Sequence, residues 1–216
     1  MSETSTLVTA EHFRYIAERT TSEDEFLREL KRAATAEGIP SIWIAPEQGS
    51  FMQILLKLAR ATDVVEVGTL AGYSAIWMAR ALPETGRVRT IEVEPKHADF
   101  AERWIAKSNV AGRIDVLRGN AVEVLKRMDH GSADAAFLDA DKASYPKYLT
   151  ECMRIVRSGG LIMVDNAFAF GEILSRETTR DDVAAMRAFN ERMAKTTGLQ
   201  GLIVPIGDGL WVAVRD

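Results

Sequence analysis

From residue 63 onward, the chain alternates short β-rich runs with longer stretches of helical character. Strands separated by helices usually pair in parallel and are covered on both faces, so the pattern predicts an α/β fold with a doubly wound sheet. The C-terminal stretch LQGLIVPIGDGLWVAV instead holds two β-rich runs joined by Gly207-Asp208-Gly209, which indicates an antiparallel hairpin. We therefore expect a seven-stranded, mostly parallel sheet. The strands expected before the hairpin lie at 63–67, 87–92, 113–118, 134–138 and 160–164.

Three helices are expected before the first strand. One covers 10–19, and the capping box Ser22-Glu23-Asp24-Glu25 indicates a second that runs to about residue 36. Pro46 opens the third, in which Phe51, Ile54, Leu55 and Leu58 recur at helical spacing. Later helices are expected at 72–82, 95–109, 120–129, 144–157 and 180–195. No repeat or linker interrupts the chain, so we expect one domain, 1–216, with an N-terminal helical extension of about 1–45.

The composition excludes several classes of partner. With 27 Lys and Arg against 31 Asp and Glu, the formal charge is -4, so no basic field is expected to hold a nucleic acid. No apolar run approaches the ~18 residues that span a bilayer, and the N-terminal residues lack the order of a secretory signal. We expect a cytoplasmic protein that binds neither nucleic acid nor membrane. Cys152, the only cysteine, is expected to be a buried core thiol, and the three histidines, His12, His97 and His130, to be surface residues.

The end of the first strand is the first place to look for a ligand. Open parallel sheets bind ligands beyond the carboxyl ends of their strands, and here the sequence reads VVEVGTLAGYSA. Gly68 allows the backbone to approach a ligand closely. The glycine spacing departs from the dinucleotide pattern G-x-G-x-x-G, and Glu66 would repel a pyrophosphate but attract an ammonium group.

Glu92 ends the second strand, about twenty residues beyond Gly72. A carboxylate in that place can accept hydrogen bonds from both hydroxyls of a ribose. Glu66 and Glu92 together therefore indicate a cationic nucleoside. The alternatives are that Glu66 caps local amides and that Glu92 is a solvated strand end.

A metal site is predicted at the ends of the fourth and fifth strands. Asp139 ends the fourth strand, and Asp165 and Asn166 end the fifth. Since adjacent strands lie only about 4.8 Å apart, these oxygens can converge on one point. Three hard oxygen ligands suit Mg²⁺, with Mn²⁺ or Ca²⁺ as alternatives, and leave coordination positions for substrate.

Lys142 follows Asp139 by three residues and could reach a hydroxyl bound at that metal. A partly desolvated amine in this place would be a general base, and two neighbouring hydroxyls would chelate the metal best. The alternative assigns Asp165-Asn166 to a turn and Lys142 to the surface. Asp141 and Ser144 are ambiguous, since Ser144 is a good N-cap for the next helix and Asp141 could favour the same helix start electrostatically. Neither is assigned to the metal.

The stretches VEVGTLAGYSA, FLDADKASY, VDNA and PIGDGL together resemble the cation-dependent O-methyltransferase family, which includes catechol and caffeoyl-coenzyme A O-methyltransferases. The resemblance runs from about Ala45 to the C-terminus. It implies a Rossmann-like class I methyltransferase fold that binds S-adenosylmethionine, and a homodimer.

The resemblance also implies roles for individual residues. Glu66, Gly68, Thr69 and Ser74 would hold the methionine part of the donor, and Glu92 the ribose. Ile44, Ala121 and Asp139 would line the donor site. The metal ligands would be Asp139, Asp165 and Asn166, with Lys142 as the catalytic base and Asp139 also needed for catalysis.

Three departures from the family pattern concern the acceptor. Ala169 stands where many bacterial relatives have tryptophan, which predicts a wider or differently shaped acceptor pocket. Ser144 stands where asparagine is common, and the N-terminal helices match loosely.

The expected reaction is methyl transfer to one hydroxyl of a metal-chelated, catechol-like aromatic small molecule. Two alternatives are a nicotinamide-dependent oxidoreductase, disfavoured by Glu66 and the missing third glycine, and a non-catalytic S-adenosylmethionine-binding module. The second is disfavoured by the joint presence of a base and a set of metal ligands.

Overall fold

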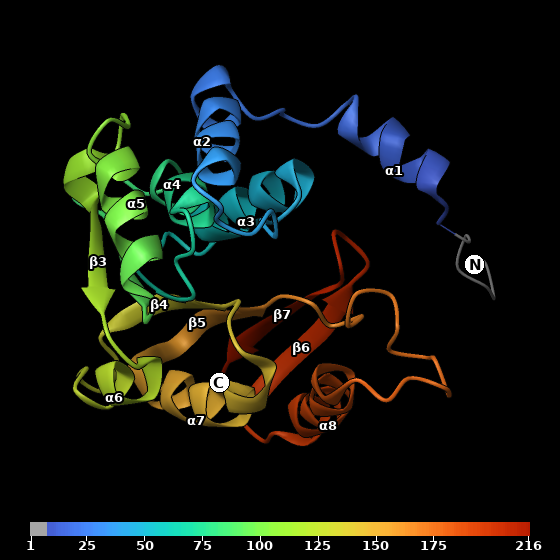
Figure 1. The fold of residues 1–216 in the computed structure, drawn as a ribbon. Helices are drawn as coiled ribbons and strands as arrows, with labels where there is room; N and C mark the ends of the chain where they lie inside the picture. The colour runs from blue at the N-terminus through green and yellow to red at the C-terminus, as the bar shows by residue number, and fades with distance from the viewer. Residues whose placement is uncertain (1–7) are drawn as a thin grey trace.

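The predicted alternation of strands and helices is confirmed in a computed structural model that describes residues 8–216. A central sheet lies between two layers of helices (Figure 1). The polar tail expected before Ala10, and the segment judged for a secretory signal, lie largely outside the described residues.

The sheet contains the seven strands expected from the sequence. Their order is β3-β2-β1-β4-β5-β7-β6, and β7 pairs antiparallel with both β5 and β6. From β1, strands β2 and β3 are added toward one edge of the sheet and β4 and β5 toward the other, so the strand order reverses between β1 and β4. A doubly wound fold places its ligand at this point. Only β5 differs clearly from its expected bounds, since it begins at Val156. The strands are β1 (Asp63–Val67), β2 (Arg87–Glu92), β3 (Ile114–Arg118), β4 (Ala133–Leu138), β5 (Val156–Val164), β6 (Leu199–Val204) and β7 (Leu210–Arg215).

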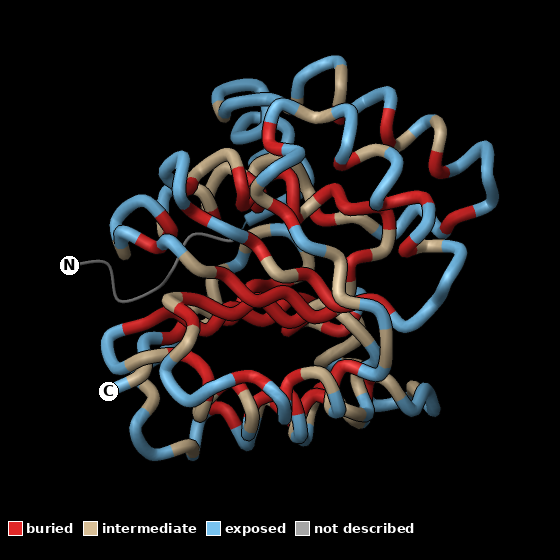
Figure 2. The backbone as a smooth tube through the Cα atoms, turned by 90° about the vertical axis from the view of Figure 1, so that its left-hand side faces the viewer, coloured by how far each residue is buried: buried red, intermediate tan, exposed pale blue. Residues whose placement is uncertain are grey.

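Helices cover both faces of the sheet, as a doubly wound fold requires. Helices α2 to α5 lie on one face and α6 to α8 on the other, each layer with its own apolar core against the sheet (Figure 1). Figure 2 shows the strands as the most continuously buried part of the chain. The helices are α1 (Ala10–Ala17), α2 (Glu25–Ala36), α3 (Pro46–Leu58), α4 (Tyr73–Ala79), α5 (Pro95–Ile105), α6 (Ala121–Lys126), α7 (Tyr145–Ile155) and α8 (Asp181–Lys195).

Local details correct two expectations about helices. Helix α2 is capped by Asp24, whose side chain accepts a hydrogen bond from the Leu27 amide at 3.0 Å, so the capping box does not begin at Ser22. In α3, Ile54 and Leu58 are exposed, and the buried positions include Met52 and Leu56. The apolar spacing predicted the helix but not its buried face.

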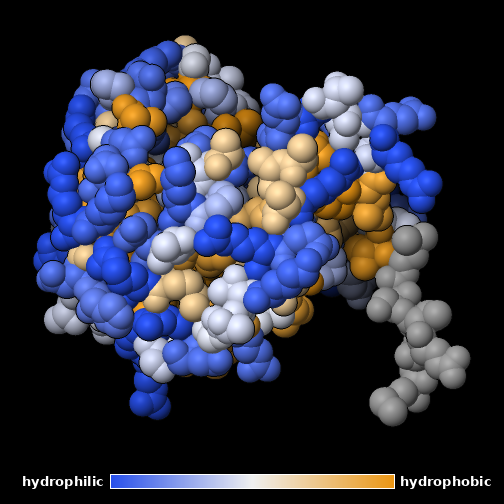
Figure 3. Space-filling view, turned by 90° about the horizontal axis from the view of Figure 1, so that it is seen from below, coloured by the Kyte–Doolittle hydropathy of each residue, from blue (hydrophilic) through white to orange (hydrophobic). Residues whose placement is uncertain are grey.

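The surface of the protein is mostly polar. Figure 3 shows the face below the sheet covered largely by hydrophilic side chains, with smaller hydrophobic patches between them. Helix α1 extends away from the body and buries none of its residues (Figure 1). Within the described residues, every helix is too short or too polar to cross a bilayer. Cys152 is buried, as expected, and burial raises the pKa of its thiol to about 12.

Candidate active site

A cavity of about 650 Å³ opens at the carboxyl end of the sheet, beside the reversal between β1 and β4. It receives residues from the loops after β1, β2, β4 and β5 and from the first turn of α8. Most predicted site residues line it, although Glu66 and Asp165 lie behind its wall. The predicted residues that line it are Ile44, Gly68, Thr69, Ser74, Glu92, Ala121, Asp139, Lys142 and Asn166.

Gly68 allows the ends of β1 and β4 to approach each other. It has φ +100°, and a Cβ added there would lie 1.9 Å from the carbonyl oxygen of Asp139. Any side chain at position 68 would therefore separate the two loops. The glycine predicted to admit a ligand thus also brings the two halves of the site together.

Glu66 is fully buried behind Ser74. Its Oε1 accepts a hydrogen bond from Ser74 Oγ, and its Oε2 has no hydrogen-bond partner among the described residues. Burial raises the pKa of Glu66 to about 8, and nearby Asp139 and Glu92 add to the rise. A buried carboxyl with one free oxygen suits a cationic ligand, since an ammonium group would stabilise its charged form.

Glu92 is buried, which excludes the alternative that it is a solvated strand end. Its carboxylate accepts hydrogen bonds from the backbone amides of Leu70 at 2.8 Å, Val93 at 3.0 Å and Glu94 at 2.9 Å. These bonds fix the carboxylate at the cavity wall, and a carboxylate has about four acceptor positions. Glu92 can therefore still accept from a ribose.

His97 corrects one expectation from the sequence. It lines the cavity, with Nδ1 3.9 Å from Glu92 Oε1, and is not a plain surface residue. His12 and His130 are exposed, as expected. Only the packing of α5 against β2 brings His97 to the cavity, and no sequence pattern indicated it.

Lys142 lies among three oxygen acceptors. Its Nζ donates hydrogen bonds to Asn166 Oδ1 and Tyr145 Oη, both at 2.6 Å, and to Asp139 Oδ1 at 3.3 Å. Its side chain is only 10% exposed, which excludes the alternative that Lys142 belongs to the outer surface. The lysine and two of the predicted metal ligands therefore meet at one point.

Asp165 joins this group through the register of the sheet. Its amide donates to the carbonyl of Leu138 at 3.0 Å, which sets Asp165 beside Asp139 at the ends of β5 and β4. Burial raises the pKa of both carboxyls; the charge of Asp139 raises that of Asp165 further, while Lys142 opposes the rise at Asp139. A divalent cation would stabilise the charged forms, so the donor set fits such an ion.

Gln48, on α3, was missed from the sequence. Its side chain is buried, and its Nε2 donates to Asp165 Oδ1 at 2.8 Å. A glutamine on an amphipathic helix carries no sequence signal for this role. The described residues hold no group of three or more His, Cys, Asp or Glu that could bind a metal, so a site here depends on the Asn166 amide oxygen.

Asp141 and Ser144 lie at the start of the next helix, but the capping side chain is that of Asp141. Asp141 Oδ2 accepts from the Ser144 amide at 3.1 Å at the start of the short 3₁₀ turn Lys142–Ser144, which precedes α7. Ser144 itself makes no side-chain capping bond. Asp141 also lines the cavity and accepts a hydrogen bond from Tyr148 Oη.

The loop after β5 corrects the expectation for Ala169. Ala169 is buried in the apolar core under α7 and α8 and does not line the cavity. The aromatic residue of this loop that lines the cavity is its neighbour Phe170, which is 51% exposed. The shape of the pocket at this loop therefore depends on Phe170 rather than on Ala169.

Comparison with known proteins identifies the family of this chain. Residues 17–216 match the family model described as O-methyltransferase. The chain is 36% identical to a catechol O-methyltransferase of Niastella koreensis, with 88% of this chain and 87% of the relative covered. The structure of an O-methyltransferase from Bacillus cereus in complex with S-adenosylhomocysteine is similar with a TM-score of 0.85 and 31% identity, covering 94% of this chain and 96% of that one.

A second solved structure, an O-methyltransferase from Streptomyces achromogenes in complex with S-adenosylmethionine, has a TM-score of 0.84 and 30% identity, with 94% of each chain covered. Its bound donor, and the product in the Bacillus protein, agree with a cavity built for a cationic nucleoside. This chain therefore belongs to the O-methyltransferase family and is an enzyme that transfers a methyl group from S-adenosylmethionine to an oxygen atom.

Proposed function

We propose that this enzyme methylates one hydroxyl of a catechol-like small molecule in a reaction that depends on a divalent metal. The observation that carries the proposal is the meeting of Asp139, Asn166 and Lys142 in the cavity that Glu92 and Ser74 also line. The Niastella koreensis relative is named for catechol, which has two neighbouring hydroxyls.

The donor would lie along the loops after β1 and β2. Glu66 and Ser74 would bind the ammonium end of its methionine part, and Glu92 would accept from the ribose. Ile44 and Ala121 would contact the rest of the donor from the cavity wall. The donor supplies an electrophilic methyl carbon on a sulfonium.

Asp139, Asp165 and Asn166 would hold Mg²⁺, with Mn²⁺ or Ca²⁺ as alternatives. Such an ion supplies charge that binds two neighbouring hydroxyl oxygens and favours loss of a proton from one of them. Lys142 would accept that proton at Nζ. The hydroxyl oxygen then bonds to the methyl carbon as the carbon–sulfur bond breaks, and the protein contributes mainly by holding the three atoms in line.

The charged residues around the cavity indicate which net charge the acceptor carries. Asp141, Asp181 and Asp182 lie along its wall, and Lys142 is the only lysine or arginine there within residues 8–216. Arg180 stands beside the cavity, but its guanidinium is paired with Asp182 and Glu172. We expect compact neutral or cationic acceptors to react faster than esters that carry several phosphates.

We also propose that the enzyme is a homodimer and acts in the cytoplasm, as the sequence predicts. In support of a dimer, α1 buries none of its residues, and Tyr15, Ile54 and Leu58 are exposed. Sedimentation velocity of the full chain tests the oligomeric state.

A mass-spectrometric acceptor screen tests the reaction. Simple catechols, catechols with an amine side chain, flavonoids and hydroxycinnamoyl-coenzyme A esters are each incubated with donor and Mg²⁺, and again with chelator. A gain of one methyl group on catechols, lost in the chelator arm, is expected. Methylation of diols at full rate in chelator would overturn the metal-dependent mechanism.

A further inference from the structure

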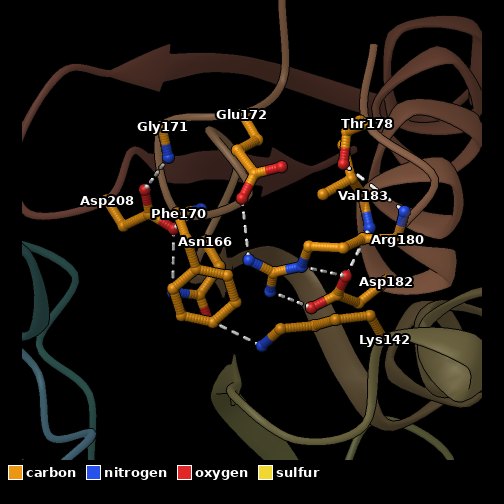
Figure 4. A network of polar contacts seen from close by, with 10 residues as sticks. All are labelled: Lys142, Asn166, Phe170, Gly171, Glu172, Thr178, Arg180, Asp182, Val183 and Asp208. Atoms are coloured by element: carbon orange, nitrogen blue, oxygen red, sulfur yellow. Dashed lines mark hydrogen bonds and ion pairs between the residues drawn. The ribbon is translucent and has the colours of Figure 1, made fainter. Parts of the chain in front are cut away.

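Asp208 lies at the tip of the hairpin between β6 and β7, outside the set of site residues expected from the sequence. Its Oδ2 accepts hydrogen bonds from Asn166 Nδ2 at 3.1 Å and from the Phe170 amide at 2.7 Å, and its Oδ1 accepts from the Gly171 amide at 3.2 Å (Figure 4). One carboxylate thus contacts a proposed metal ligand and the backbone of the loop that carries it.

These contacts fix which way the Asn166 amide faces. As an ammonium group, Lys142 can only donate hydrogen bonds, and its Nζ donates to Asn166 Oδ1 at 2.6 Å. A carboxylate can only accept, and Asp208 Oδ2 accepts from Asn166 Nδ2. A flipped amide would set its NH₂ against the ammonium group and its oxygen against the carboxylate. Asp208 therefore favours the orientation in which the Asn166 oxygen faces Lys142 (Figure 4).

The backbone of this loop gives a second reason for the contact. Asn166, Ala169 and Phe170 have φ angles of 61°, 50° and 58°, in the left-handed region that residues other than glycine rarely adopt. Such conformations persist only where their surroundings fix them. Asp208 supplies two of the fixing hydrogen bonds, to the amides of Phe170 and Gly171.

The hairpin tip fits closely against its neighbours. A Cβ added at Gly207 would lie 2.1 Å from Gln48 Oε1, and one added at Gly209 would lie 2.8 Å from the ring of Phe168. Both glycines also have positive φ, at 55° and 80°. The glycines that flank Asp208 therefore let the tip reach between α3 and the loop after β5.

We propose that Asp208 is a positioning residue that holds the Asn166 side chain with its oxygen toward the metal site. The inference rests on the proposed metal dependence of the reaction. Residues that orient a metal ligand typically contribute about tenfold to a hundredfold to metal affinity. Asp208 is therefore expected to increase metal affinity without binding the metal itself, because its carboxylate is hydrogen-bonded to Asn166 and to the loop.

The test measures Mn²⁺ affinity by electron paramagnetic resonance and Mg²⁺ affinity by calorimetry. Asp208→Asn and Asp208→Ala are each expected to weaken metal binding by about tenfold or more. Affinity for S-adenosylhomocysteine, measured without metal, is expected to stay within about twofold of the parent value, because Asp208 does not line the cavity.

An exchange of the two side chains separates orientation from general damage. Asn166→Asp alone places two carboxylates in contact, so the metal-free protein should lose stability through like-charge repulsion. In the double variant Asn166→Asp with Asp208→Asn, the amide and the carboxylate change places and their hydrogen bond can form again. The metal-free double variant is expected to have a higher Tm than metal-free Asn166→Asp.

Asp134→Asn is the matched control for a carboxylate with a purely structural role. Asp134 accepts from the amides of Thr62 and Asp63 at 2.7 and 3.0 Å, at the opposite end of the sheet. That variant should lose stability while keeping its metal affinity. Parent-like metal affinity in both Asp208 variants would overturn the positioning role, as would a Tm of the double variant no higher than that of Asn166→Asp. No metal uptake by the parent chain would overturn the proposed metal dependence as well.

Discussion

Gln48 Nε2 donates a hydrogen bond to Asp165 Oδ1 at 2.8 Å, which joins two side chains 117 residues apart in the sequence. The bond crosses from α3 to the end of β5. It leaves Asp165 fixed in orientation at the back of the proposed metal site, although the carboxylate itself does not line the cavity. The N-terminal helices therefore contribute to the chemistry of a site that strands β4 and β5 carry.

Replacing Gln48 by leucine should weaken both metal binding and the fold. Leucine cannot donate to Asp165, and a buried acceptor left without a partner costs about 1–3 kcal/mol of unfolding free energy. Mg²⁺ affinity is expected to fall by about tenfold, as for loss of other residues that orient metal ligands. Calorimetry and thermal unfolding measure the two effects.

Gln53→Leu is the control for that substitution. Gln53 lies on the same helix and donates its side chain to the carbonyl of Trp77 at 2.8 Å, away from the cavity. It should lose stability without losing metal affinity. Equal metal affinity in the Gln48 and Gln53 variants would show that Gln48 has no special relationship to the site.

Lys142→Met should reduce kcat by about 10²–10⁴ while leaving donor affinity nearly unchanged, because the variant lacks the proposed base. Single-turnover methylation of a catechol, followed with titration of S-adenosylhomocysteine, separates the two quantities. Lys147→Met is the control, since Lys147 is exposed on α7. A Lys142→Met enzyme with parental kcat would exclude the lysine as the base.

Removing divalent cations should abolish methylation but not donor binding. Chelator-treated enzyme is expected to regain activity with Mg²⁺ or Mn²⁺, because the oxygens of Asp139, Asp165 and Asn166 suit such ions. Asp139→Asn should not regain it at the same metal concentration. Donor binding without metal, measured by calorimetry, shows whether the chelated protein is still folded.

Glu66 should make the stability of the donor-free protein fall as the pH rises. Its folded pKa of about 8 lies above the ordinary glutamate value, so between about pH 5 and pH 8 the folded state holds a proton that the unfolded state has released. The contribution of Glu66 is greatest below that range and is lost across it. Asp139 and Asp165, whose pKa values are also raised, act in the same direction.

The Glu66→Gln variant isolates this contribution. Glutamine does not titrate, so the fall in Tm between pH 5 and pH 8 should be shallower than in the parent protein. The variant should also bind S-adenosylhomocysteine more weakly, since it lacks the charge for the ammonium group. An unchanged pH slope would mean that Glu66 is already ionised near neutral pH in the folded protein.

The sequence by itself determined the fold and the edge of the sheet where the site lies. Runs such as DVVEV and GLIMV specify strands locally, and parallel strands present their carboxyl ends at the same edge. For this reason the sequence alone predicted that Asp139, Asn166 and Glu92 lie at the same edge of the sheet.

Only the tertiary structure decided which side chains reach across from other elements. Gln48, His97 and Asp208 come from a helix, a second helix and a hairpin, and none belongs to a local pattern that indicates a site. The buried face of α3 was likewise set by what packs against it. The apolar spacing included Ile54 and Leu58, which are exposed, so it did not identify that face. Local patterns fix the type of an element because they depend on backbone geometry and burial of one face, whereas contacts between elements depend on how those faces pack together.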